Sequence, residues 1–221
     1  ITATVTVNPL PTATISGGAT ICNGSSTNIS FSGTPNAIVT YSVNGGANQT
    51  TTLDNFGEGS VSTGNLTTNT TYQLVSVRSA GMPTCSQSQT GSVVVSVIPV
   101  PLVNTVVSSP TICSGQPTGI SLSSNVTTAT YNWTIIQSGV IGASLGNGSI
   151  ISQILTATGV VPGTVTYSIM ANEGVCQGPA TPITITVNPI PVVTPSTMLQ
   201  SVCSGSVSPI QLTSNVAARM M

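Results

Sequence analysis

Apolar and polar residues alternate along most of this chain in short runs with the period of a β-strand. Seven residues after three of the cysteines lies an apolar pair separated by one polar residue: Ile29/Phe31, Ile120/Leu122 and Ile210/Leu212. Such spacing places both members of a pair on one face of a sheet. We find no helical periodicity, and turn residues separate the runs. About seven short strands per unit predict an all-β protein built from β-sandwiches.

A valine- and threonine-rich strand that ends in a Pro-x-Pro segment occurs three times, and the first prolines of the three segments are spaced by 90 residues. A fixed period of this length predicts tandem domains joined end to end. We expect the last strand of a preceding repeat at 1–8, full repeats at 9–98 and 99–188, and an incomplete repeat at 189–221. Because proline fixes φ and biases its predecessor toward extended conformations, we expect stiff hinges. The hinge prolines are Pro9, Pro11, Pro99, Pro101, Pro189 and Pro191.

The five cysteines follow the same period. Cys22 and Cys85 are 63 residues apart, as are Cys113 and Cys176, and Cys203 repeats the phase of the first cysteine. We expect one disulfide within each repeat, Cys22–Cys85 and Cys113–Cys176, with the partner of Cys203 near position 266, outside the sequence. Free thiols and a metal site are the alternatives. The absence of histidine and of a CxxC pair argues against metal. Disulfides would indicate an oxidising, extracellular location.

Charged residues make up only 2% of the chain, with two Lys or Arg and three Asp or Glu. Two arginines cannot neutralise a row of phosphates, so we do not expect a nucleic-acid partner. Every apolar run is interrupted well before the roughly 20 residues that a membrane helix needs, so we expect no membrane span. No cofactor is expected, and solubility depends on hydroxyl and amide side chains.

Few residues could carry chemistry. Asp54 and Glu58 share one loop, whereas the second repeat offers only Glu173, and no histidine or lysine could activate a serine. We therefore expect no enzyme. A solvated turn is the interpretation of the Asp54–Glu58 loop, and a calcium site is its alternative. For Trp133, the only tryptophan, we expect a core position, and an exposed platform for sugars is the alternative.

The segment Gly163–Tyr167, continued through Cys176 to Val187, resembles the closing half of PKD-like domains. The Val-Asn-Pro-x-Pro hinge and the Ile-Cys-Ser-Gly opening are similar to repeats of large Bacteroidetes surface proteins. The gliding-motility adhesins, exported by the type IX secretion system, are the type that these repeats resemble. The segment Asp54–Gly59 only loosely matches the Trp-Asp-Phe-Gly-Asp-Gly segment of PKD domains, so a generic immunoglobulin-like sandwich fits equally well.

The resemblance implies a structural repeat of an extracellular adhesin or filament at the cell surface, acting as a stiff disulfide-locked stalk. Its partners would be neighbouring repeats, surface polysaccharide or copies of itself. One alternative is a spacer or carbohydrate-binding array of a secreted enzyme. The other is a self-polymerising fibre in which the Ile1–Val7 strand completes the sheet of a neighbouring subunit.

Overall fold

The computed structural model of this protein describes residues 3–5, 7–196, 201–207 and 210–216. All regular structure in these residues is β, which confirms the predicted fold class. Contacts divide the chain into two units. The first comprises residues 1–100 with Gly174–Cys176, and the second comprises Pro101–Glu173 with residues 177–221.

The first unit has two sheets. One contains β1 (Ala13–Ser16), β3 (Asn28–Gly33) and β6 (Glu58–Ser62) in the order β1-β3-β6. The other has the order β2-β9-β7-β4-β5, with β8 added beside β7. Its strands are β2 (Thr20–Cys22), β9 (Ser92–Ile98), β7 (Thr70–Arg78), β4 (Ile38–Val43), β5 (Gln49–Thr52) and β8 (Ser86–Ser88).

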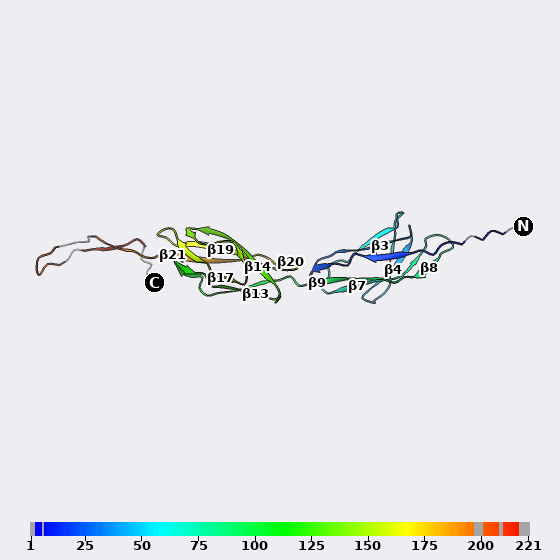
Figure 1. Ribbon diagram of the computed structural model, residues 1–221, viewed down its shortest axis with the longest axis horizontal. Helices are drawn as coiled ribbons and strands as arrows, with labels where there is room; N and C mark the ends of the chain where they lie inside the picture. The colour runs from blue at the N-terminus through cyan, green and yellow to red at the C-terminus, as the bar shows by residue number, and fades with distance from the viewer. Residues whose placement is uncertain (1–2, 6, 197–200, 208–209, 217–221) are drawn as a thin grey trace. The chain divides into compact units, whose positions relative to one another are not determined.

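The second unit repeats this plan. Its first sheet contains β10 (Val103–Val107), β13 (Ile120–Ser124) and β17 (Ile150–Ile151). Its larger sheet has the order β11-β21-β19-β14-β16, and β14, β19 and β21 lie side by side in Figure 1. These strands are β11 (Thr111–Cys113), β21 (Thr181–Asn188), β19 (Gly163–Glu173), β14 (Thr130–Ser138) and β16 (Gly146–Asn147).

Shorter strands complete the structure. β20 (Cys176–Gln177) pairs with β19. A small sheet has the order β12-β18-β15, and one further pair is formed by β22 with β23. Their bounds are β12 (Gln116–Pro117), β18 (Ile154–Ala157), β15 (Val140–Ile141), β22 (Val193–Pro195) and β23 (Leu212–Ser214).

Strand register follows the repeat in the sequence. Val103 of β10 pairs with Ser124 of β13, and Val193 of β22 pairs with Ser214 of β23, so the second pair is shifted by 90 residues. A hydrogen bond also recurs with the repeat. The backbone N–H of the residue after each second hinge proline donates to a side-chain oxygen further along the chain. These bonds are Thr12 to Thr34 Oγ1 (2.9 Å), Leu102 to Asn125 Oδ1 (2.7 Å) and Val192 to Asn215 Oδ1 (2.5 Å).

Each unit has its own hydrophobic core, because alternate residues of its strands face inward. The predicted inward pairs Ile29/Phe31 and Ile120/Leu122 are buried, whereas Ile210 and Leu212 are exposed. Aromatic rings are prominent in the first core, where the Phe31 and Tyr41 ring centroids are 5.2 Å apart. In the second core the fully buried Tyr167 donates its hydroxyl proton to Gln153 Oε1 at 2.9 Å.

The second proline of the first two hinges is buried against its own unit. Gln87 donates a hydrogen bond to the Pro11 carbonyl at 2.6 Å. In the second unit, 91 residues later, the glycine at 178 takes the place of this glutamine, and its backbone lies directly against the Pro101 carbonyl. The third segment differs, because Pro189 is buried and Pro191 is exposed. The hinge role of these six prolines stays a prediction.

The boundaries predicted at 1–8, 9–98, 99–188 and 189–221 also stay predictions. Residues 3–5, 7 and 8 carry no strand, and Ile1, Thr2 and Thr6 lie outside the described residues, so the strand expected at Ile1–Val7 is not observed in the described part. The third repeat is represented by β22 and β23, which belong to the second unit by their contacts.

The close approach of Gly178 to Pro101 predicts a selective loss of stability. A methyl group at position 178 would collide with the Pro101 carbonyl, whereas a methyl group at Gly159 would meet nothing within 4 Å. Gly178→Ala should lower the free energy of unfolding of the second unit by about 2 kcal/mol, the usual cost of overpacking. Gly159→Ala should change it by less than about 0.5 kcal/mol. Urea unfolding followed by the fluorescence of Trp133 measures both, and equal midpoints for the two variants would contradict the prediction.

Burial raises the pKa of Tyr167, and the neighbouring Thr118 hydroxyl lowers it by less. The unfolded chain therefore releases this proton first, at an ordinary tyrosine pKa of about 10. The stabilising contribution is complete below about pH 10 and is lost as the pH rises further. Tyr167→Phe should accordingly flatten the alkaline fall in stability, measured by urea unfolding with thiols blocked. An equal loss of stability at alkaline pH in the unchanged chain and in Tyr167→Phe would show that the Tyr167 hydroxyl is not responsible.

Candidate functional site

The structure joins Cys22 to Cys176 by a disulfide, with their Cα atoms 5.5 Å apart. Cys85, Cys113 and Cys203 are free thiols. The predicted bonds Cys22–Cys85 and Cys113–Cys176 are therefore wrong, although the expectation that cysteines of this chain form a disulfide is confirmed.

Strand direction explains why Cys22 cannot reach Cys85. The short strand β2 runs parallel to β9, which places Cys22 beside Ile98 at the end of the unit where β9 finishes. Cys85 precedes β8, whose first residue pairs with Arg78 at the far end of β7. Since β7 is antiparallel to β9 and has nine residues, about 26 Å of strand separates the two ends.

The second predicted repeat has the same geometry. Cys113 ends β11 and lies beside Asn188 of the parallel strand β21. Gly163, the first residue of β19, pairs with Val187 at that same end. Cys176 follows the other end of β19, which is eleven residues long, so the two cysteines are about 33 Å apart along the strand.

The disulfide holds the turn after β19 within the first unit. Gly174, Val175 and Cys176 belong to that unit by their contacts. The Sγ atom of Cys22 lies 3.9 Å from the Val175 carbonyl oxygen, and Cys176 is almost fully buried. The bond spans 154 residues of sequence. Closing a loop of this size lowers the entropy of the unfolded chain, which raises the free energy of unfolding by about 5 kcal/mol.

The acidic loop of the first unit is a hydrogen-bonded turn. Asp54 Oδ1 accepts the backbone N–H groups of Phe56 and Glu58 at 2.8 and 2.9 Å. The Ser32 hydroxyl donates to Glu58 Oε1 at 2.8 Å. Among the described residues, no group of three or more His, Cys, Asp or Glu side chains is placed to hold a metal ion. The hydrogen bonds of Asp54 and Glu58 agree with the interpretation of this loop as a turn.

Trp133 belongs to the second core, as expected, and only 5% of it is exposed. Its indole N–H donates to the Ser144 carbonyl at 3.1 Å. A side chain at Gly146, on the adjacent strand β16, would collide with the indole ring. The alternative interpretation, an exposed platform for sugars, is therefore wrong.

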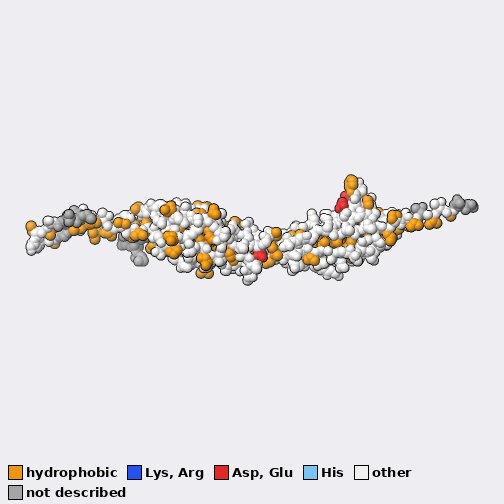
Figure 2. All heavy atoms as spheres, viewed as in Figure 1, with side chains coloured by type: hydrophobic (Ala, Val, Ile, Leu, Met, Phe, Trp, Pro, Cys, Tyr) orange, Lys and Arg blue, Asp and Glu red, His pale blue; other side chains and the backbone are white. Residues whose placement is uncertain are grey.

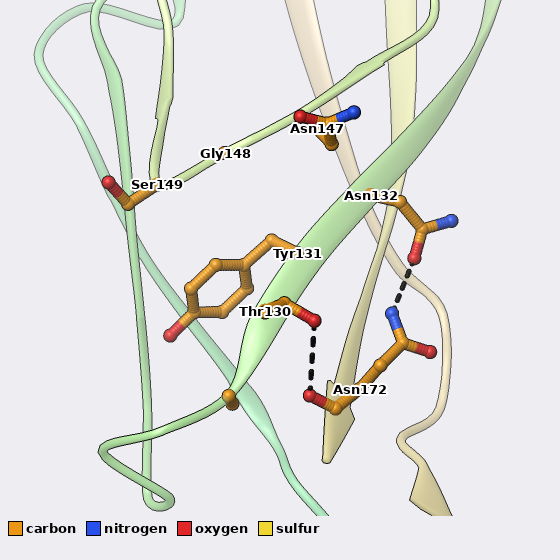
Figure 3. Close-up of a pocket in the computed structure, with 8 residues that line it drawn as sticks. Thr130, Tyr131, Asn132, Asn147, Gly148, Ser149 and Asn172 are labelled. Carbon is orange, nitrogen blue, oxygen red and sulfur yellow. Dashed lines mark hydrogen bonds between the residues drawn. The ribbon is translucent and has the colours of Figure 1, made fainter. Parts of the chain in front are cut away.

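A shallow pocket of about 520 Å³ opens at the beginning of β14 in the second unit (Figure 3). Its lining is Ala129, Thr130, Tyr131, Asn132, Asn147, Gly148, Ser149 and Asn172. Because successive side chains of a strand point to opposite sides, Tyr131 faces Gly148 and Ser149, whereas Asn132 lies on the side of Asn172. No charged side chain lines the pocket.

Hydrogen bonds organise the amide side of the pocket. Asn172 Nδ2 donates to Asn132 Oδ1 at 2.6 Å, and Gln177 Nε2 donates to Asn172 Oδ1 at 3.1 Å. On the other side the Gly148 N–H donates to the Tyr131 carbonyl at 3.1 Å. The pocket thus combines fixed amides with one aromatic ring. The sequence did not predict a site at these residues, because amides and hydroxyls are frequent throughout the chain.

Uncharged polar atoms and backbone make up most of the face drawn in Figure 2, with scattered apolar side chains and few acidic ones. No helix among the described residues is long and apolar enough to cross a bilayer. The surface agrees with the composition, in which only five residues carry charge.

Comparisons with known proteins agree with this architecture. Residues 110–191 match the family model of the PKD-like domain. No curated protein matches the chain. Among solved structures, the chain is similar to a marsupial T cell receptor at 14% identity with a TM-score of 0.50, covering 84% of this chain and 76% of that one.

Two mouse structures are also similar at 14% identity: murine CEACAM1b, with a TM-score of 0.36, and a mouse coronavirus receptor-binding domain complexed with its murine receptor, with a TM-score of 0.41. Each match covers 80% of this chain and 100% of the other. The similarity to the T cell receptor shows an immunoglobulin-like fold, and residues 110–191 match the PKD-like domain model.

Proposed function

We propose that this chain is a load-bearing stalk segment of an extracellular protein. The observation that carries the proposal is the disulfide between Cys22 and Cys176. When the chain is pulled from its two ends, tension passes from residue 22 to residue 176 through the sulfur atoms. Residues 23–175 lie outside this force path. They include strands β3 to β19, and therefore most of both cores.

A disulfide of this kind persists in oxidising surroundings, which supports an extracellular location. The uncharged polar surface and the PKD-like domain agree with a structural or adhesive role. We further propose a surface adhesin of the gliding-motility type, exported by type IX secretion, as the whole protein. The support for this step is the repeated Val-Asn-Pro-x-Pro and Ile-Cys-Ser-Gly sequence. We propose no catalytic role, because the sequence contains no histidine or lysine to activate its hydroxyl groups.

Force spectroscopy tests the stalk function directly. With the chain held at its ends, complete unfolding of the oxidised protein should release only the residues outside the disulfide loop. A reductant that opens Cys22–Cys176 should add roughly 500 Å of contour length, since 154 residues extend by about 3.4 Å each. The variant Cys22→Ser should show the longer extension without reductant. An oxidised chain that extends to its full length would overturn the proposal.

Binding of neutral polysaccharide is a second candidate function, favoured by the pocket beside Tyr131. Amide and hydroxyl groups can both donate and accept hydrogen bonds, and an aromatic ring adds an apolar face with a polar tip. The absence of charge from the lining fits an uncharged, hydroxyl-rich ligand.

A titration with neutral hexose oligosaccharides, followed by NMR, tests this second function. Chemical shifts should change at Tyr131, Asn147 and Ser149 and remain constant in the first unit. Tyr131→Ala should abolish the changes. The matched control is Tyr41→Phe, which alters a core tyrosine of the first unit and should bind normally. Unchanged spectra at millimolar oligosaccharide, or an equal response of Tyr131→Ala, would remove this function.

A further inference from the structure

Two cysteines of this chain have the same backbone environment, although only one of them is bonded. Cys22 ends β2 and Cys113 ends β11, and each strand runs parallel to the last long strand of its unit. The following residue donates its N–H to that last strand in both cases, from Asn23 to the Ile98 carbonyl at 2.9 Å and from Ser114 to the Asn188 carbonyl at 2.8 Å. We call Cys22 and Cys113 the strand-end cysteines.

The turn after each strand-end cysteine is also the same. Gly24 and Gly115 have φ values of 83° and 86°, a conformation that favours glycine. Their N–H groups donate to the carbonyls of Leu66 and Leu155 at 2.8 and 2.7 Å. The backbone therefore has the same setting at Cys22 and at Cys113, and the free thiol of Cys113 is exposed.

Cys85 and Cys176 form a second class, which we call the turn cysteines. They are 91 residues apart, and each follows the turn at the end of the long central strand, β7 or β19. Cys85 directly precedes β8, which pairs with β7, and Cys176 is the first residue of β20, which pairs with β19. Cys85 has a free thiol and is half-buried.

The bond Cys22–Cys176 thus joins a strand-end cysteine to a turn cysteine. The two free cysteines in equivalent positions are Cys113 and Cys85, one from each class. Cys203 repeats the sequence phase of the strand-end cysteines but does not end a strand, so it belongs to neither class. We propose that Cys113 of one copy of this chain bonds to Cys85 of a second copy, repeating between copies the pairing that Cys22 and Cys176 make. Repulsion does not oppose the encounter, because the net charge of each copy is only −1.

Formation of this bond needs an oxidant, and a low-molecular-weight disulfide such as oxidised glutathione is sufficient. The thiolate of the exposed Cys113 attacks one glutathione sulfur, forms a mixed disulfide and releases the first glutathione thiolate. The Cys85 thiolate of the second copy then attacks the Cys113 sulfur and displaces the second glutathione. The two protons lost by the protein thiols end on the two glutathione thiolates. Two protein thiols are thereby oxidised and one glutathione disulfide is reduced.

The 221-residue chain tests the proposal when it is oxidised with glutathione disulfide and analysed by non-reducing electrophoresis and peptide mapping. We expect a ladder of multimers and a cross-linked peptide pair that contains Cys85 and Cys113. Cys113→Ser and Cys85→Ser should each lose every species above the monomer while retaining the Cys22–Cys176 peptide pair. An equimolar mixture of the two variants should form dimers and nothing larger. Cys203→Ser, the control, should leave the ladder unchanged.

Three outcomes would overturn the pairing. They are a chain that remains monomeric, a bond between Cys85 and Cys113 of one chain, and cross-links that use Cys203 or join two identical cysteines. The force experiment tests the bond between Cys22 and Cys176, whereas this one tests Cys85 and Cys113. The stalk function and the cross-linking of copies can therefore fail separately.

Discussion

Parallel pairing of one short strand with the last strand of each unit is the constraint on which the covalent structure depends. Because β2 and β9 run in the same direction, the cysteine at the end of β2 is placed where β9 finishes. The central strand β7 runs in the opposite direction, so the turn that follows it lies at the other end. β11, β21 and β19 repeat this arrangement. A bond between the two cysteines of one predicted repeat would have to span the length of a long strand.

Strand periodicity and the 90-residue repeat were sufficient to predict the all-β fold and the burial of Ile29, Phe31, Ile120 and Leu122. The core position of Trp133 followed from its place in the repeat. The bond between Cys22 and Cys176 could not be predicted from the repeat. A spacing that is constant within repeats is equally constant when partners are offset by one repeat, so the period cannot distinguish the two schemes. The direction of the strands that flank each cysteine decides between them.

The polar pocket was beyond sequence reasoning for another reason. Asn132 and Asn172 are 40 residues apart, and the pairing of β14 with β19 brings them together. In a chain this rich in amides and hydroxyls, no single asparagine stands out. The same side-chain types also stabilise the repeat, since Thr34, Asn125 and Asn215 accept the backbone N–H that follows each Pro-x-Pro segment. Neutral hydrogen-bonding groups therefore perform the connecting roles that ion pairs perform in more charged proteins.

The separation of the two cysteine classes has a consequence for how such a gene can change. Duplication or deletion of a complete repeat adds or removes one strand-end cysteine together with one turn cysteine. A change in repeat number therefore alters both classes by the same number of cysteines. Loss of a single cysteine by point substitution instead leaves its former partner unpaired. The number of repeats can thus change without altering the balance between the two classes, whereas a substitution of Cys22 or Cys176 alters it.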